Sequence, residues 1–156
     1  QKGVDKSCPL CRKPLPPGPD QLFDLGYGMY SKIKGEIDRS RPGVKPETAW
    51  PALTAEQQDG MDQVVAMLRE AADQGLMEAQ LYCGELYAFG RGVTKDDRLA
   101  FVYHEKAAQQ GWAGSQYNTG VSYEVGRGCE QSLKRAFEWF EKAARQPRGG
   151  SDRSHP

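Results

Sequence analysis

Apolar residues follow a helical spacing over most of the chain. In the first such stretch, residues 20–38, they recur at three- and four-residue steps: Leu22, Leu25, Met29, Ile33 and Ile37. This spacing predicts a helix with one buried stripe. Three glycines weaken that helix, so we expect it to depend on packing.

A second helix is predicted to begin after Thr54. The run from Thr54 to Gln57 resembles a capping box, in which the two side chains and the two backbone amides bond reciprocally. Gly75 is placed to end this helix as a C′ glycine. The stretch 39–51 contains three prolines and is predicted to be a loop, with Trp50 and Leu53 as its anchors.

The rest of the chain contains two near copies of one segment. Residues 71–110 and 107–146 align without a gap at a spacing of 36 residues. A fixed period of this length is typical of stacked helical repeats. The pattern predicts helices at 77–89, 96–109, 113–125 and 132–145, joined by glycine-containing turns. Positions shared by the copies are small or aromatic: Gly84 and Gly120, Tyr87 and Tyr123, Gly90 and Gly126, Gly92 and Gly128, Ala100 and Ala136.

The shared small residues have a packing role. Gly84 and Gly120 suit close contact between the helices of a hairpin, against Ala100 and Ala136 of the second helices. The turn glycines can take the left-handed backbone that ends a helix. Because one hairpin cannot bury its apolar stripe alone, stacking is expected. The fold class predicted is therefore an all-α solenoid with a concave and a convex face.

The repeated motif resembles the Sel-1-like repeat, a relative of the tetratricopeptide repeat. Its first half corresponds to the run from Ala79 to Val93, and its second half to the run from Ala100 to Ala108. The resemblance implies a right-handed stack of helix-turn-helix units. It also implies that the protein is a scaffold or adaptor for protein complexes. Cys83 and Thr119 stand where the family usually has leucine, so looser inner packing is expected.

Five segments are expected along the chain. They are the end of a zinc finger with a proline-rich linker (1–18), a degenerate helical hairpin with a long loop (19–75), two repeats (76–111 and 112–146), and a disordered polar tail (147–156). Because the first residue is Gln1 rather than methionine, the chain is expected to be a fragment or a processed form.

A partner protein is expected to bind polar residues of the first helices. The candidates occupy positions interpreted as non-core: Gln80, Glu85, Gln116, Tyr117 and Asn118. The alternative is that each simply faces solvent. Positions at which the two copies differ, such as His104 against Phe140, are further places to look for a partner.

Composition narrows the possible functions. Lys plus Arg equals Asp plus Glu at 21 each, which removes the electrostatic argument for nucleic acid binding. No apolar run is long enough for a membrane span. The four cysteines do not form a secreted disulfide framework, so an intracellular, reducing compartment is favoured.

The first two cysteines have a spacing with chemical meaning. Cys8 and Cys11 are separated by two residues, which suits half of a tetrahedral zinc site. The two histidines have no spacing that suggests a partnership with them. Cys83 and Cys129 are interpreted as small packing residues. Zinc is therefore expected only if further ligands lie upstream of Gln1.

The stretch Cys8-Pro9-Leu10-Cys11-Arg12 resembles the final ligand pair of a RING-type zinc finger. The resemblance implies that Pro9 contacts a ubiquitin-conjugating enzyme and that Arg12 bridges this enzyme and its ubiquitin. A vestigial finger end without zinc is an open alternative. So is a glutaredoxin-like redox pair, although the strand and βαβ pattern which that fold requires are not present around it.

No phosphate-binding loop, catalytic carboxylate pair or Ser-His-Asp arrangement stands out. Gly-Arg-Gly at 90–92 and 126–128 fits helix C-caps better than anion sites. We predict a non-enzymatic protein-interaction scaffold or adaptor, acting on its own or as an accessory subunit of a larger assembly. The alternative function is a RING-type ubiquitin ligase whose repeats recruit substrate.

Overall fold

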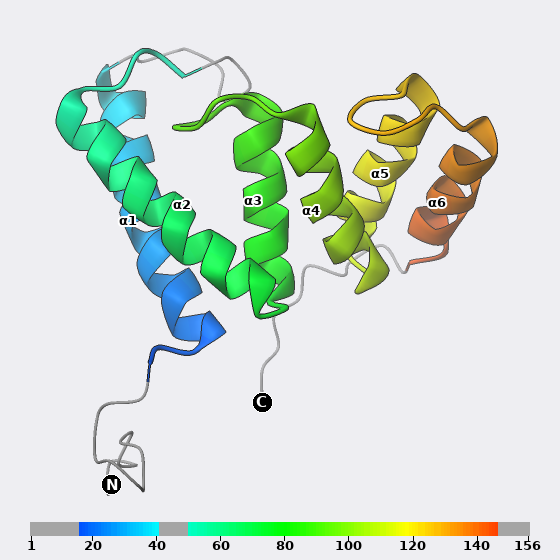
Figure 1. The fold of residues 1–156 in the computed structure, drawn as a ribbon, viewed down its shortest axis with the longest axis horizontal. Coiled ribbons are helices and arrows are strands. Elements are labelled where there is room, and N and C mark those ends of the chain that lie inside the picture. Colours follow the sequence, from blue (N-terminus) through cyan, green and yellow to red (C-terminus); the bar gives the residue numbers. More distant parts are fainter. Residues whose placement is uncertain (1–15, 41–49, 147–156) are drawn as a thin grey trace, which may run out of the picture.

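The structure, a computed structural model, describes residues 16–40 and 50–146. All regular structure in these residues is helical, as Figure 1 shows. The helices are α1 (Pro19–Ser40), α2 (Ala55–Asp73), α3 (Met77–Phe89), α4 (Asp97–Gln109), α5 (Ala113–Val125) and α6 (Leu133–Arg145). Each packs against the next along the chain, so the predicted all-α solenoid is confirmed. The zinc half-site at Cys8 and Cys11, the contacts assigned to Pro9 and Arg12, and the tail 147–156 lie outside the described residues.

Helix α1 is amphipathic, but its buried stripe differs from the predicted one. Leu25 is 57% exposed, whereas Phe23 and Tyr30 are buried. The stripe passes through Gly26, where an added Cβ would lie 3.3 Å from the Cβ of Met67 on α2. Because a glycine at the crossing lets the two helices approach closely, the neighbouring rings enter the core. A pattern based on hydrophobicity alone ignores this glycine and assigns the stripe to Leu25.

Helix α2 begins with the predicted capping box. Thr54 Oγ1 accepts from the Gln57 backbone N–H at 3.2 Å, and Gln57 Oε1 accepts from the Thr54 N–H at 3.1 Å. The helix ends before Gly75, whose φ of 95° is left-handed. Upstream of the helix, Trp50 stacks on Tyr30 with ring centroids 5.7 Å apart, and Leu53 also packs against the core. Both predicted anchors are therefore confirmed.

The two repeats have equivalent turns and helix contacts. Gly90 and Gly126 end α3 and α5 in the left-handed conformation, with φ of 63° and 70°. Gly84 and Gly120 permit close contact as predicted, but with rings rather than with alanines. An added Cβ at Gly84 would lie 2.8 Å from the His104 ring, and one at Gly120 would lie 2.6 Å from the Phe140 ring. The second helix of each repeat therefore seats a ring on the glycine of the first.

The apolar interior is divided unequally along the stack. A large cluster joins α1, α2, α3 and α4 and includes the fully buried side chains of Met61, Val64 and Leu68. A second cluster lies between α4, α5 and α6, and its buried members are Phe101, Tyr123 and Ala136. The C-terminal hairpin therefore rests on much less buried apolar surface than the N-terminal part.

Candidate protein-interaction surface

Aromatic rings from α1 and α3 form a cluster that reaches the surface. Tyr27 and Tyr82 meet edge to face with centroids 5.1 Å apart, and the Tyr30 ring lies 6.2 Å from Tyr82. Trp50 stacks on Tyr30, and Glu85 lies one turn beyond Tyr82 on α3. Tyr27 is 40% exposed. We call these residues (Tyr27, Tyr30, Trp50, Tyr82 and Glu85) the tyrosine face.

The tyrosine face combines protonated tyrosine hydroxyls with a partly buried carboxyl group. Burial raises the pKa of Tyr30 and of Tyr82 above the ordinary value, so both hydroxyls keep their protons. Burial likewise raises the pKa of the Glu85 carboxyl, while the nearby Arg91 guanidinium opposes this shift. Tyrosine combines a large rigid apolar ring with a polar tip, and it is enriched in protein interfaces. The arrangement is therefore suited to binding rather than to nucleophilic chemistry.

Two of the predicted partner-binding residues are structural. Gln80 and Gln116 are each only 5% exposed, so their assignment to non-core positions is wrong. The Gln80 Nε2 donates to the Ala72 carbonyl at 3.1 Å, and the Gln116 Nε2 donates to the Ala108 carbonyl at 3.2 Å. Each amide adds a second hydrogen bond to a carbonyl at the end of the preceding helix, which also accepts from the backbone N–H of Gly75 or Gly111. These glutamines join consecutive hairpins.

The other three predicted residues remain accessible to different degrees. Glu85 is half-buried within the tyrosine face. Tyr117 and Asn118 are exposed on α5, and the Tyr117 ring lies 5.5 Å from Phe140. Asn118 occupies the position of Tyr82 one repeat later, since the two are 36 residues apart. The structure therefore brings only Glu85 of this set into the aromatic cluster.

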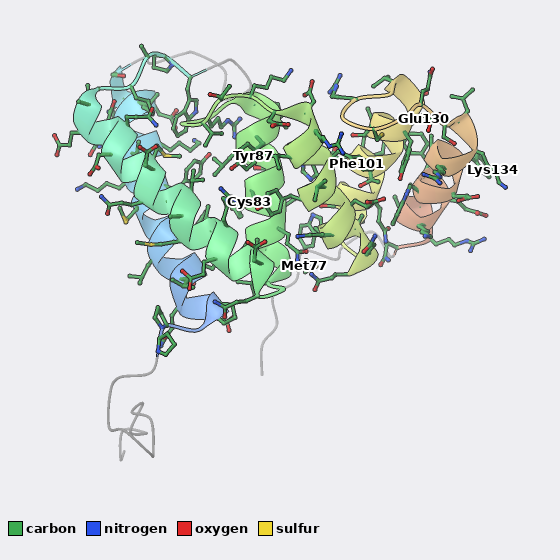
Figure 2. The ribbon with its side chains drawn as sticks, viewed as in Figure 1. Met77, Cys83, Tyr87, Phe101, Glu130 and Lys134 are labelled. Atoms are coloured by element: carbon green, nitrogen blue, oxygen red, sulfur yellow. The ribbon has the colours of Figure 1, made fainter. Side chains whose placement is uncertain are left out.

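Residues that differ between the repeats include buried ones. His104 is 6% exposed, so it does not offer a partner the accessible side chain that its mismatch with Phe140 indicated. Burial lowers its pKa to about 4, so the imidazole is neutral at pH 7. Cys83, labelled on α3 in Figure 2, is fully buried, whereas Cys129 is partly accessible. Burial raises the pKa of the Cys83 thiol to about 12, consistent with its predicted packing role.

A hollow of about 450 Å³ lies between α1 and the start of α2. Its lining mixes Met29 and Ile33 with Lys32 and the carboxylates of Glu36 and Asp59. Within residues 16–40 and 50–146, no three His, Cys, Asp or Glu side chains lie close enough together to hold a metal ion. The same residues include no helix with the length and apolar content of a membrane span.

Within the tyrosine face, sequence reasoning selected Glu85 as a binding candidate but missed the three tyrosines. Tyr27 and Tyr30 lie on one helix three positions apart, and Tyr82 is more than fifty residues away. A usable signal was present at position 82, where the second repeat carries Asn118 instead of a ring. A large side chain that the stack does not need at every repeat is a candidate for binding.

Comparison with known proteins finds the same repeat and the same fold elsewhere. The Sel1 repeat model matches residues 78–112 and 113–147. A crystal structure of a Sel1 repeat protein from Oxalobacter formigenes is 33% identical to this chain, with a TM-score of 0.56. That match covers 85% of this chain and 90% of the other. The chain belongs to the Sel1-repeat family. Its repeats therefore match those expected from the residues of α3 to α6.

Two other structures are similar to this Sel1-repeat chain. A protective antigen of uropathogenic Escherichia coli strains, described as displaying an SLR fold, is 27% identical with a TM-score of 0.60. That match covers 81% of this chain but only 22% of the antigen. Cysteine rich protein B of Helicobacter pylori is 18% identical with a TM-score of 0.51, covering 82% of this chain and 92% of the other, and supports the fold alone. No curated protein sequence matches this one. Sel1 repeats mediate protein interactions, so protein binding is the general function of this fold.

Proposed function

We propose that this Sel1-repeat chain is a non-enzymatic adaptor which binds a partner protein through the tyrosine face. The observation that carries the proposal is the aromatic cluster of Tyr27, Tyr30 and Tyr82, which spans two helices and remains open at Tyr27. Clustered tyrosines of this kind are typical of the few interface residues that supply most binding energy.

The surroundings of the cluster favour a polypeptide as the ligand. The Tyr30 and Tyr82 hydroxyls keep their protons and can take part in hydrogen bonds with peptide groups, while the rings cover apolar side chains. The Glu85 carboxyl and the Arg91 guanidinium lie beside the rings and can fix the register of a bound segment. A rigid platform formed by two packed helices also orders few groups on binding, which limits the entropic cost.

The test uses a matched pair of exposed residues. Tyr27 is 40% exposed in the tyrosine face, and Leu99 is 37% exposed on α4. Tagged full chains carrying Tyr27→Ser or Leu99→Ser are isolated from the source cells, and the co-purifying proteins are quantified by mass spectrometry. We expect one partner to be lost with Tyr27→Ser but retained with Leu99→Ser. Equal recovery with both variants would contradict the proposal.

A second candidate function rests on the stretch from Cys8 to Arg12. Its likeness to the last ligand pair of a RING finger supports a ubiquitin ligase, with Cys8 and Cys11 binding zinc beside ligands supplied from upstream sequence. Ubiquitin transfer by the full-length protein should then collapse with Arg12→Ala and persist with the neighbouring control Lys13→Ala. Loss of bound zinc with Cys8→Ser is the accompanying readout. Transfer that is unchanged by Arg12→Ala would exclude this mechanism.

A further inference from the structure

We propose that the outer face of α6 is a docking surface for a second copy of this chain, in which the two α6 helices pair antiparallel. This α6 face consists of Leu133, Phe137 and Ala144, which recur at four and seven residues and so form one stripe. The half-buried Phe140 borders the stripe, and its own ring packs on Gly120 of α5. Leu133 and Phe137 are each 68% exposed. The inference is independent of the partner proposed for the tyrosine face.

The preceding repeat shows that this stripe is a packing surface. On α4, Phe101 and Ala108 occupy the positions of Phe137 and Ala144, 36 residues earlier, and they are 9% and 1% exposed. Helix α5 covers them, with Phe101 edge to face against Tyr123 at 5.2 Å. Figure 2 shows Phe101 between α4 and α5, whereas α6 lies at the end of the described stack. The α6 face thus continues an interface that the fold already uses.

The C-terminal hairpin is expected to gain stability from a helix that covers the α6 face. Its buried apolar cluster is small, and several buried polar atoms lack a hydrogen-bond partner within the described residues: Ser115 Oγ, Gln116 Oε1 and Thr119 Oγ1. Unpaired buried polar groups are costly. A hairpin with so little apolar burial gains stability when another helix covers its remaining stripe.

The charges beside the stripe favour a second copy as the occupant. Lys134 and Glu141 flank the α6 face on the same side, one helical repeat of seven residues apart. Lys134 is labelled on the outer side of α6 in Figure 2. When two α6 helices run antiparallel, these flanking positions face each other, so Lys134 of each copy meets Glu141 of the other. The symmetric antiparallel dimer therefore contains two equivalent ion pairs between Lys134 and Glu141.

Alternative pairings use these charges less well. In a parallel pair, the same positions face those of Ala136 and Ala143, which cannot form ion pairs. Within one chain, Glu141 accepts from Arg145 at 2.7 Å, but this pair is exposed and lies within a single helix turn. Such exposed pairs contribute little to stability, so exchanging one for a contact between copies costs little. A single helix pair buries a small area, and a weak dimer is expected.

Sedimentation velocity of the full chain over a broad concentration range tests the pairing. We expect a concentration-dependent monomer–dimer equilibrium and a melting temperature that rises with concentration. Phe137→Glu should leave a folded monomer, because that side chain is exposed in the single chain. Glu138→Lys, a charge change on the same helix away from the stripe, should leave the dimer intact. A wild-type chain that remains monomeric, or a dimer that persists in Phe137→Glu, would overturn the proposal.

A charge exchange tests the antiparallel arrangement. Lys134→Glu and Glu141→Lys should each weaken the dimer by about tenfold or more, because each places like charges opposite one another. The double variant K134E/E141K should restore it. Mixing the two single variants should produce a heterodimer stronger than either homodimer. Failure of both the double variant and the mixture to recover the dimer would exclude the antiparallel pairing.

Discussion

The two Sel1 repeats have the same spacing of equivalent residues but different surroundings. Comparing them distinguishes residues that stabilise the stack from residues that stay exposed. The repeat formed by α3 and α4 lies between α2 and α5. The repeat formed by α5 and α6 packs against α4 on one side, and within the described residues its other side is open. Phe101 and Phe137 hold equivalent positions, yet one is buried and the other exposed.

The buried inner positions of the two repeats also differ, and the second repeat is again the less well packed. Ala79 and Cys83 in the first repeat become Ser115 and Thr119 in the second, and all four are buried. Gln80 Oε1 accepts a hydrogen bond at 2.8 Å from Gln110. Its counterpart, Gln116 Oε1, has no partner among the described residues. The second repeat therefore keeps the shape of the first with weaker internal packing.

The strongest test of this contrast is truncation of the two equivalent phenylalanines. Phe101→Ala should lower the free energy of unfolding by about 3–5 kcal/mol, because it removes a buried ring. Phe137→Ala should change it by about 0.5 kcal/mol or less in dilute solution, where the ring remains in water. Urea denaturation followed by circular dichroism measures both values. Equal losses would show that the two environments are not distinct.

A somewhat smaller effect is expected at His104 and depends on pH. Burial lowers the pKa of this imidazole to about 4 from an ordinary value of 6.5, so the unfolded chain takes up a proton that the folded chain does not. The resulting contribution to stability is complete above pH 6.5 and is lost as the pH falls towards 4. The loss is about 3 kcal/mol at most.

His104→Phe provides the control for that pH effect, because Phe140 already packs over the equivalent glycine. The variant should lack this part of the pH dependence. It should also be more stable near pH 7 by about 1 kcal/mol, since the buried His104 Nδ1 has no hydrogen-bond partner within the described residues. Chemical denaturation at several pH values provides the comparison. If the difference in unfolding free energy between the wild type and His104→Phe did not change with pH, the lowered pKa of His104 would be contradicted.

The smallest difference concerns the two cysteines of the repeats. Cys83 is 1% exposed with its pKa raised to about 12, whereas Cys129 is only partly buried. In a chain carrying Cys8→Ser and Cys11→Ser, a thiol reagent should modify Cys129 in the folded state and Cys83 only on unfolding. Mass spectrometry of the modified peptides distinguishes the two sites. Modification at equal rates would show that Cys83 is not enclosed.

Much of the fold could be predicted from the sequence because its signals are local or periodic. The repeat at 36 residues defined α3 and α5 at their observed ends, and the capping box defined the start of α2. The buried stripe of α1 was assigned wrongly at Leu25, because the helix crossing at Gly26 depends on a contact with Met67. That contact is distant in sequence and leaves no periodic signal.

The site was less predictable than the fold. Polar character was treated as a sign of exposure, but Gln80 and Gln116 donate to backbone carbonyls in the interior, between consecutive hairpins. No role was assigned to Tyr27, which lies 40% exposed beside Tyr82. The contact between Tyr27 and Tyr82 joins α1 to α3 and is too distant in sequence to leave a periodic signal.

Site-specific photo-crosslinking tests the central claim, partner binding by the tyrosine face, most directly. A benzophenone amino acid is introduced in place of Tyr82, and separately in place of Val102, which is 37% exposed on α4. After irradiation in the source cells, the chain modified at position 82 should form a covalent adduct with one partner protein. The chain modified at position 102 should not. An adduct formed equally at both positions, or only at position 102, would contradict the account.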